Sequence, residues 1–262
     1  MGIVRRLTRS PHIRGDVAER FGRHLSSGRI LDLPAGSGVN SRPLQIAGYR
    51  VQAADIFPDP CRAASPDVPC DAVDMTRPLP YSDDAFDGVL HSEGIEHVDA
   101  QIELLSEFHR VLRPGGVLIV TTPNLLHLEG RVSMFLSGHV HPRRAMVVAN
   151  AAYWGAKRTG DGRCYFGHVF LINHFQLRFY LTHVGFEIVE VDTTRYSWKS
   201  LLLTPFLWPF VAASTRRLLR RRVNFVPPTL QRQLAREVLG PAVLFGRKLI
   251  VVARKPERAT CL

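Results

Sequence analysis

The fold of this chain is decided by the stretch Arg29-Ile-Leu-Asp-Leu-Pro-Ala-Gly-Ser-Gly-Val-Asn40, together with Val51-Gln-Ala-Ala-Asp55 shortly after it. An apolar strand ends on Asp32, a glycine-containing turn follows, and a second strand ends on Asp55. Glycines let a backbone come close to a ligand, and an acidic residue about 20 positions further on can hold ribose hydroxyls. The stretch therefore predicts a strand–turn–helix–strand unit that binds a ligand carrying a nucleoside.

Strands and helices alternate on both sides of this stretch. We predict helices at 12–27, 41–48, 99–112 (capped by Asp99) and 174–184 (stopped by Gly185). We predict strands at 29–33, 49–56, 70–75, 86–91, 117–120, 186–192 and 248–253. This alternation implies right-handed crossovers and an α/β fold, a doubly wound and mostly parallel seven-stranded sheet.

Polar residues stand at five successive strand ends, where ligands bind in such sheets: Asp32, Asp55, Asp74, His91 and Thr121-Thr122. Dinucleotide oxidoreductases and proteins that use an adenosyl group both bind there. The dinucleotide fingerprint places a third small residue, Gly or Ala, where this chain has Ser41. The glycine pattern alone therefore does not decide between the two classes.

The motifs around the glycine turn narrow the choice. They are Asp32-x-Pro-x-Gly36-x-Gly38, Asp74-Met75, Phe86-Asp-Gly-Val-Leu-His-Ser-Glu-Gly-Ile-Glu-His97 and Phe108-His-Arg-Val-Leu-Arg-Pro-Gly-Gly-Val-Leu-Ile-Val120. In this order the chain resembles the class I S-adenosylmethionine-dependent methyltransferases, from about Gly28 to Asn124 and again from His168 through Gly185. The resemblance implies a Rossmann-like methyltransferase fold with a lid insertion, and S-adenosylmethionine as the cofactor.

The resemblance also implies which residues bind that cofactor. The methionine end of the cofactor would be bound by Asp32 and by the backbone at Ala35, Gly36 and Gly38. The adenosine end falls to Asp55 on the ribose hydroxyls, Ile56 against adenine, and Asp74 beside the Met75 backbone at the adenine amino group. His91 would lie beside the methyl-bearing sulfonium. Pro34 stands where many members have Gly, so the turn has one N–H donor fewer.

Methyl transfer to a hydroxyl needs a general base, and His is the usual choice near neutral pH. The candidates are His91, His97, His127, His139, His141 and His168. Among them we predict His97 and His168 as catalytic residues.

Glu93-Gly-Ile-Glu96-His97 also looks like the E-x-x-E-H spacing of ubiquinone-pathway O-methyltransferases, which bind a divalent cation. On one helical turn Glu93, Glu96 and His97 could face one way and hold Mg²⁺. We favour the alternative, in which Glu96 and His97 make only structural hydrogen bonds after the strand, because such motif matches have false positives.

Charge is concentrated in the C-terminal quarter. Residues 195–262 carry 14 Lys or Arg against two acidic residues, whereas the whole chain is +11, so the first 194 residues are close to neutral. The apolar run 201–213 precedes an arginine-rich segment, 216–222. The run is too short to span a bilayer and Pro205 and Pro209 interrupt it. We expect contact with an anionic membrane surface, ahead of core packing and, last, nucleic acid.

We therefore predict one methyltransferase domain over 1–262, with a lid or substrate insertion at 125–165 and a hydrophobic-basic insertion at 197–225. The predicted activity is methylation, at oxygen rather than carbon or nitrogen, of a small-molecule, lipid or lipid-linked acceptor. The alternative is a non-catalytic adenosyl-binding module that recruits a partner to membrane. Four scattered cysteines and the lack of a signal-peptide pattern predict a cytoplasmic protein, peripheral on the inner face of the membrane.

Overall fold

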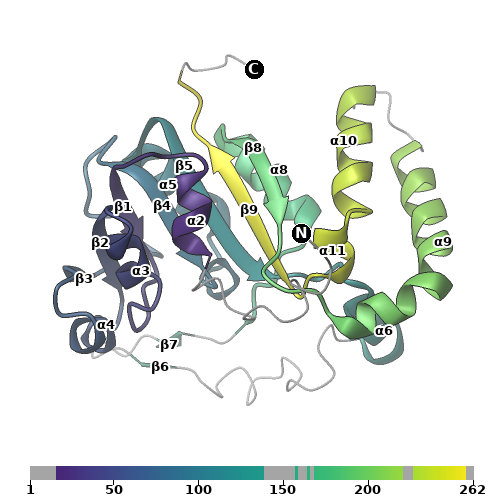
Figure 1. Ribbon diagram of the computed structural model, residues 1–262, viewed down its shortest axis with the longest axis horizontal. Coiled ribbons are helices and arrows are strands. Elements are labelled where there is room, and N and C mark those ends of the chain that lie inside the picture. Colours follow the sequence, from purple (N-terminus) through teal and green to yellow (C-terminus); the bar gives the residue numbers. More distant parts are fainter. Residues whose placement is uncertain (1–15, 139–156, 159–163, 166–167, 221–226, 258–262) are drawn as a thin grey trace.

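The computed structural model describes residues 16–138, 157–158, 164–165, 168–220 and 227–257 (Figure 1). Its centre is a seven-stranded sheet in the order β3-β2-β1-β4-β5-β9-β8. The strands are β1 (Arg29–Asp32), β2 (Arg50–Asp55), β3 (Cys70–Ala72), β4 (Phe86–Ser92), β5 (Leu112–Pro123), β8 (Glu187–Asp192) and β9 (Lys248–Arg254). Only β9 runs against its neighbours, so the mostly parallel fold predicted from the sequence is confirmed. A separate two-stranded sheet joins β6 (Lys157–Arg158) to β7 (Cys164–Tyr165).

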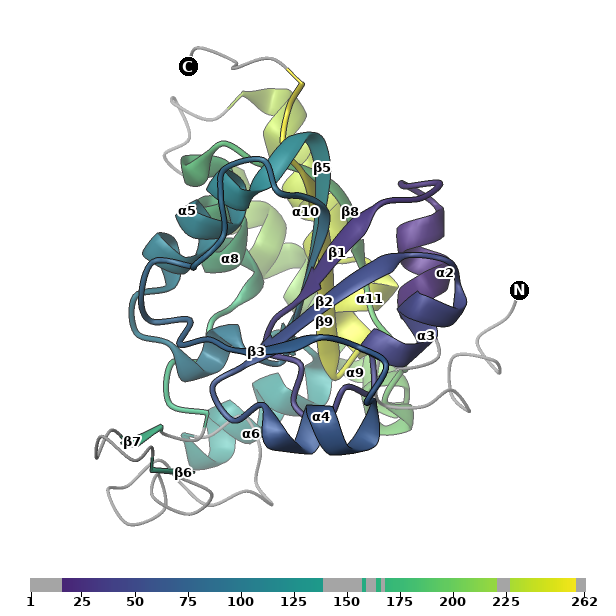
Figure 2. The same ribbon diagram turned by 90° about the vertical axis from the view of Figure 1, so that its left-hand side faces the viewer.

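Helices cover both faces of the sheet, and the apolar periodicity explains which side each one buries (Figure 2). On one face α5 (Gln101–Val111) and α8 (His174–Val184) form a core around Leu105, Phe108 and Leu177. On the other face lie α2 (Val17–Gly22), α3 (Ser41–Ile46) and α4 (Asp59–Ala64), packed through Phe21 and Leu44. Strands buried on both sides in this way are continuous apolar runs, as β5 is at 117–120.

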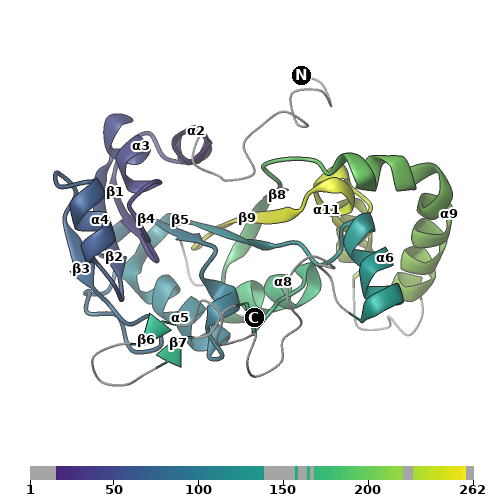
Figure 3. The same cartoon turned by 90° about the horizontal axis from the view of Figure 1, so that it is seen from below.

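The direction of β9 determines which edge of the sheet the remaining helices leave from. Since β9 is antiparallel to both β5 and β8, the carboxyl ends of β5 and β8 meet at the same edge as those of β1, β2 and β4. From that edge α6 (Leu128–Ser137) follows β5 and α9 (Trp198–Arg220) follows β8. Together with α10 (Pro228–Val238) and α11 (Pro241–Phe245) they form a helical projection at one end of the molecule (Figure 3).

Three local expectations were wrong. Asp99 does not cap α5: the N-cap is Ala100, and the Asp99 carboxylate accepts from the Ala100 N–H instead. The strand expected at 117–120 begins earlier: the Arg113-Pro-Gly-Gly segment already belongs to β5, because Leu112 pairs with Phe86. Pro205 and Pro209 do not end the helix: α9 passes through both, bending along its length (Figure 3).

The two predicted insertions are partly covered by the described residues. Of 125–165 the structure describes α6 and the short strands β6 and β7, while 139–156 and 159–163 lie outside the described residues. Of 197–225 it describes α9, while 221–225 lies outside. Helix α4 was not predicted.

Candidate active site

Asp32, at the end of β1, is a fully buried carboxylate that is only half satisfied. The Ser41 hydroxyl donates to its Oδ2 at 2.6 Å, whereas Oδ1 has no hydrogen-bond partner among the described residues. Burial, more than the nearby Asp55 charge, raises the Asp32 pKa to about 7 despite the Ser41 hydrogen bond. Such a group strongly favours a cationic ligand, which would pair with the buried oxygen.

Asp55, at the end of β2, is held in place by the turn beside it. Its Oδ2 accepts from the Gly36 N–H at 2.8 Å and its Oδ1 from the Phe57 N–H at 2.9 Å. One backbone donor on each oxygen fixes the orientation of the carboxylate and leaves each oxygen a second lone pair. Asp55 is thus pre-oriented for a hydroxyl pair, the role that the sequence predicts.

The glycine turn has space for a ligand, but its backbone N–H groups already make hydrogen bonds within the protein. The Ala35, Gly36 and Gly38 N–H groups already donate within the protein, to the Ala54 carbonyl, the Asp55 carboxylate and the Ala35 carbonyl. A Cβ placed on Gly36 would meet no atom within 4 Å, and its φ of 58° is one that side chains rarely adopt. The turn therefore leaves an open cradle above Gly36, which fits close approach of a ligand to the backbone.

The adenosine-side residues lie further along the same edge. Asp74 accepts from the Thr76 hydroxyl and N–H and faces Arg77 at 3.6 Å. Met75 packs on the core and Ile56 is half-buried.

His91, at the end of β4, is a buried neutral imidazole. Burial lowers its pKa to about 4 although the Leu33 carbonyl lies 2.6 Å from Nδ1. The Nδ1 proton therefore goes to Leu33, and Nε2 carries a lone pair with no partner among the described residues. A neutral ring of this kind can stand beside a sulfonium without repelling it.

Because Gly94 has no side chain, the His91 ring can lie close to it. Gly94→Ala should therefore lower both the stability of the protein and its affinity for the cofactor. A Cβ there would lie 2.5 Å from Pro34 Cδ and 2.6 Å from His91 Cε1, neither of which ends a flexible chain. We expect a loss of roughly 1–3 kcal/mol in the free energy of unfolding, together with weaker cofactor binding. Thermal unfolding and titration calorimetry measure the two, with Gly22→Ala, where the nearest atom is 3.9 Å away, as the control. Unchanged stability and affinity for Gly94→Ala would contradict the prediction.

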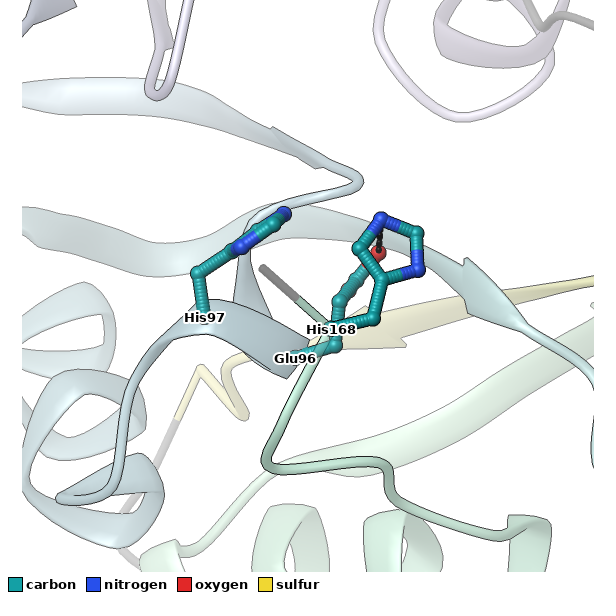
Figure 4. A group of neighbouring side chains, drawn as sticks. All are labelled: Glu96, His97 and His168. Atoms are coloured by element: carbon teal, nitrogen blue, oxygen red, sulfur yellow. Dashed lines mark ion pairs between the residues drawn. The ribbon is translucent and has the colours of Figure 1, made fainter. Parts of the chain in front are cut away.

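Glu96, His97 and His168 form a cluster beyond β4 (Figure 4). Glu96 and His97 belong to the 3-10 turn η2 (Ile95–His97), and His168 comes from the segment before α8. One ligand atom of each lies within 4.8 Å of the others, the two rings meet edge-on at 4.9 Å, and His168 Nε2 is 4.0 Å from Glu96 Oε1. Sequence reasoning named both histidines; the structure brings them together.

Glu96 is the buried member of this cluster. Its Oε2 accepts from the Thr122 hydroxyl at 3.0 Å, and Oε1 has no hydrogen bond within the described part of the chain. Burial and then the Glu93 charge raise its pKa to about 8. A cation forming next to Oε1, such as an imidazolium, would be stabilised by ionisation of this carboxyl.

Glu93 does not join the cluster. Its backbone has a φ of 55°, outside any helical turn, and its carboxylate pairs with Lys248 Nζ at 2.8 Å and accepts from Thr121 Oγ1. Among the described residues, the group that lies together is Glu96, His97 and His168, one carboxylate and two imidazoles, and not the Glu93, Glu96 and His97 set that we considered and did not favour. This donor set does not fit Mg²⁺, which prefers oxygen ligands.

Ser41 is the site residue that sequence reasoning missed. The sequence singles it out only as a misfit to the dinucleotide pattern, yet its hydroxyl donates a hydrogen bond to Asp32 Oδ2. A hydroxyl at the third position of the glycine pattern, at the start of the following helix, was the available signal.

Comparisons with known proteins agree with this geometry. Residues 6–191 match the family model of a methyltransferase domain. Demethylmenaquinone methyltransferase of Beutenbergia cavernae is 35% identical over 128 residues, 47% of this chain and 53% of that protein. That of Mycobacterium bovis is 43% identical over 93 residues, 35% of this chain and 39% of that protein. The matched part thus spans about half, or less, of these relatives.

Solved structures share the fold at low identity. A SAM-dependent methyltransferase from Archaeoglobus fulgidus superposes with a TM-score of 0.56 at 18% identity, covering 92% of this chain and 94% of that one. A methyltransferase from Haloferax volcanii, solved with the Trm112 activator, gives 0.55 at 16% identity and covers 96% and 92%. With the family model matching over most of its length, the chain belongs to the methyltransferase-domain family, and it has the class I methyltransferase fold.

Proposed function

We propose that this enzyme methylates a hydroxyl oxygen of a small, lipid or lipid-linked acceptor. The observation that carries the proposal is the cluster of Glu96, His97 and His168, which places two imidazoles beside a buried carboxyl after β4. S-adenosylmethionine supplies the methyl group from its sulfonium. The protein contributes binding, orientation and a place for the acceptor proton.

The cofactor residues fit a cationic amino acid joined to adenosine. The unpartnered Asp32 Oδ1 suits the methionine ammonium, the cradle above Gly36 suits close backbone approach, and Asp55 suits the ribose. Neutral His91 suits the neighbourhood of the sulfonium. We assign Ile56, Asp74 and Met75 to adenine on the family resemblance.

His168 is the residue to which we assign the acceptor proton. The acceptor hydroxyl would lose its proton to the His168 imidazole as its oxygen takes the methyl group, and His168 Nε2 lies 4.0 Å from Glu96 Oε1. Glu96 is a positioning residue that stabilises the imidazolium, and the His97 ring holds His168 edge-on. The proposed step uses no metal ion, and the donor set does not fit Mg²⁺.

We infer the class of methyl acceptor from the names of the relatives and from the exposed apolar side chains of the protein. The relatives are named for demethylmenaquinone, so a quinone-related acceptor with a hydroxyl in its reduced form is the first to test. Exposed apolar side chains on α6 and α9 suit delivery of such an acceptor from an anionic membrane surface.

The direct test is product detection by mass spectrometry with S-adenosylmethionine and a panel of quinols, phenols and amines. A methyl ether of a quinol or phenol supports the proposal, and a product methylated at carbon or nitrogen contradicts it. Calorimetry with S-adenosylmethionine runs alongside. Binding without turnover on any acceptor would favour the adenosyl-binding module.

Cofactor affinity should fall with acidity below about pH 7. With its pKa raised to about 7, Asp32 is protonated below that pH in the free protein and cannot pair with the ammonium, which stays charged there. Dissociation constants measured by calorimetry should therefore rise toward tenfold per pH unit below the Asp32 pKa. Asp32→Asn should bind weakly with little pH dependence, and a flat wild-type profile would contradict the assignment.

A further inference from the structure

Helix α9 exposes large apolar side chains where a surface helix usually exposes polar ones. Trp198, Leu202, Phe206 and Phe210, spaced four apart on one side, are between 58 and 75% exposed. The side chains that α9 buries are small or polar: Ser200, Ala212 and Thr215. A helix that packs on the core of its own protein buries its large apolar residues. Those of α9 are exposed, which indicates that a binding partner covers them.

The neighbouring helix extends this apolar surface. Helix α6 packs beside α9, and the Glu129 N–H and carboxylate bind Ser200 and Ser197 at the start of α9. The last turn of α6 exposes Met134, Phe135 and Leu136, with Phe135 88% exposed. We call the large exposed apolar residues of α6 and α9 the apolar face: Met134, Phe135, Leu136, Trp198, Leu202, Phe206, Trp208, Phe210 and Leu218.

Positive charge accompanies the apolar face. The sequence of α9 contains Lys199, Arg216, Arg217 and Arg220 and no acidic residue. Lys199 lies over the Trp198 ring at 5.8 Å and Arg216 over the Trp208 ring at 5.9 Å. Aromatic rings beside cations, next to apolar side chains, match the headgroup region of a bilayer. A second copy of this chain would instead bring like charges together.

We propose that the apolar face docks on a lipid bilayer containing anionic headgroups, with the apolar side chains in the acyl boundary and the cations at the headgroups. No helix within the described ranges is long and apolar enough to cross a membrane. Helices α6 and α9, which carry the apolar face, follow β5 and β8 at the sheet edge that also carries Asp32, Asp55 and His91. The docking deepens, and for a lipid acceptor rests on, the proposed function.

Flotation with phosphatidylcholine vesicles, with or without phosphatidylglycerol and without S-adenosylmethionine, tests the docking. Wild type should bind the anionic vesicles, and less as salt rises. Phe206→Ser with Phe210→Ser, and separately Arg216→Ala with Arg217→Ala, should each weaken binding on the order of tenfold or more. Ile46→Ser, which removes a 78% exposed apolar side chain from α3, is the matched control and should bind as wild type does.

Three results would overturn the docking. They are no binding of wild type to anionic vesicles at low salt, wild-type binding by the Phe206/Phe210 variant, and a dimer in sedimentation equilibrium that this variant abolishes. The two proposals fail separately. The Phe206/Phe210 variant should keep its S-adenosylmethionine affinity and its turnover of a water-soluble phenol. Wild type that binds anionic vesicles but does not methylate the phenol would count only against the proposed reaction, and wild type that methylates the phenol but does not bind vesicles would count only against the docking.

Discussion

Replacing Asp32 by Asn is expected to weaken S-adenosylmethionine binding by on the order of a hundredfold or more. The carboxylate is fully buried, and its free Oδ1 is the group that we pair with the methionine ammonium. Removing one member of a desolvated charge pair costs about 2–5 kcal/mol, because the other charge stays without a partner. Asn keeps the shape and can still accept from the Ser41 hydroxyl. Titration calorimetry at pH 8 measures the loss.

The same substitution should stabilise the cofactor-free protein at high pH. The folded pKa of Asp32 is about 7, above its unfolded value of about 4, so the folded state binds the proton more tightly and stability falls as pH rises from about 4 to 7. Three pKa units correspond to about 4 kcal/mol as an upper estimate. Asn carries no charge, so its melting temperature without cofactor should exceed that of wild type by several degrees at pH 8 and by much less at pH 5.

Asp59→Asn is the matched control for both effects. The Asp59 side chain is 91% exposed at the start of α4, and its replacement should leave affinity and melting temperature unchanged. An Asp32→Asn protein that binds S-adenosylmethionine as tightly as wild type would remove Asp32 from the cofactor site. One that melts lower at pH 8 would show that the carboxylate is satisfied in the folded protein.

Replacing His168 by Ala is expected to lower kcat by about 10²–10⁴ with little change in S-adenosylmethionine affinity. The imidazole would no longer take the acceptor proton, whereas Asp32, Asp55 and His91 would be untouched. Added imidazole should restore part of the rate, an effect that a purely structural histidine would not show. The measurement is single-turnover methyl transfer to a quinol or phenol, with and without imidazole.

His97→Ala and Glu96→Gln separate catalysis from positioning. His97→Ala should lower kcat less than His168→Ala and should not respond to imidazole, because its ring supports His168 from the side at 4.9 Å. Glu96→Gln should reduce kcat while leaving KM for the acceptor nearly unchanged. Full turnover by His168→Ala, or imidazole rescue of His97→Ala only, would overturn the assignment of the proton to His168.

Much of the fold was predictable because its signals are local. Apolar runs gave every strand of the main sheet within a few residues, and Gly185, with a φ of 106°, ends α8 where expected. The wrong predictions concern positions where more than one local hydrogen bond or backbone arrangement is possible. Asp99 accepts from the Ala100 N–H next to it instead of capping the helix, and α9 tolerates two prolines because its neighbours support it.

The candidate site, like the fold, was predictable only in part: the positions of its residues along the sheet edge were predictable, and their hydrogen-bond partners were not. Asp32, Asp55 and His91 could be placed from the sequence, because parallel strands bring their carboxyl ends to one edge. The partners of these residues could not be placed, since hydrogen bonds such as Ser41 to Asp32 and Lys248 to Glu93 depend on how helices and distant strands pack.

By itself, the sequence determined the sheet, its ligand-binding edge and the residue types that face a cofactor there, because strand periodicity and glycine turns act over a few neighbouring residues. Only the tertiary structure decided which groups are buried without partners, and hence the raised pKa of Asp32 and Glu96. It also placed His168 beside Glu96 and His97, kept Glu93 apart from them, and exposed several large apolar side chains of α9. Burial and long-range contact are properties of the packed chain, and no local pattern encodes them.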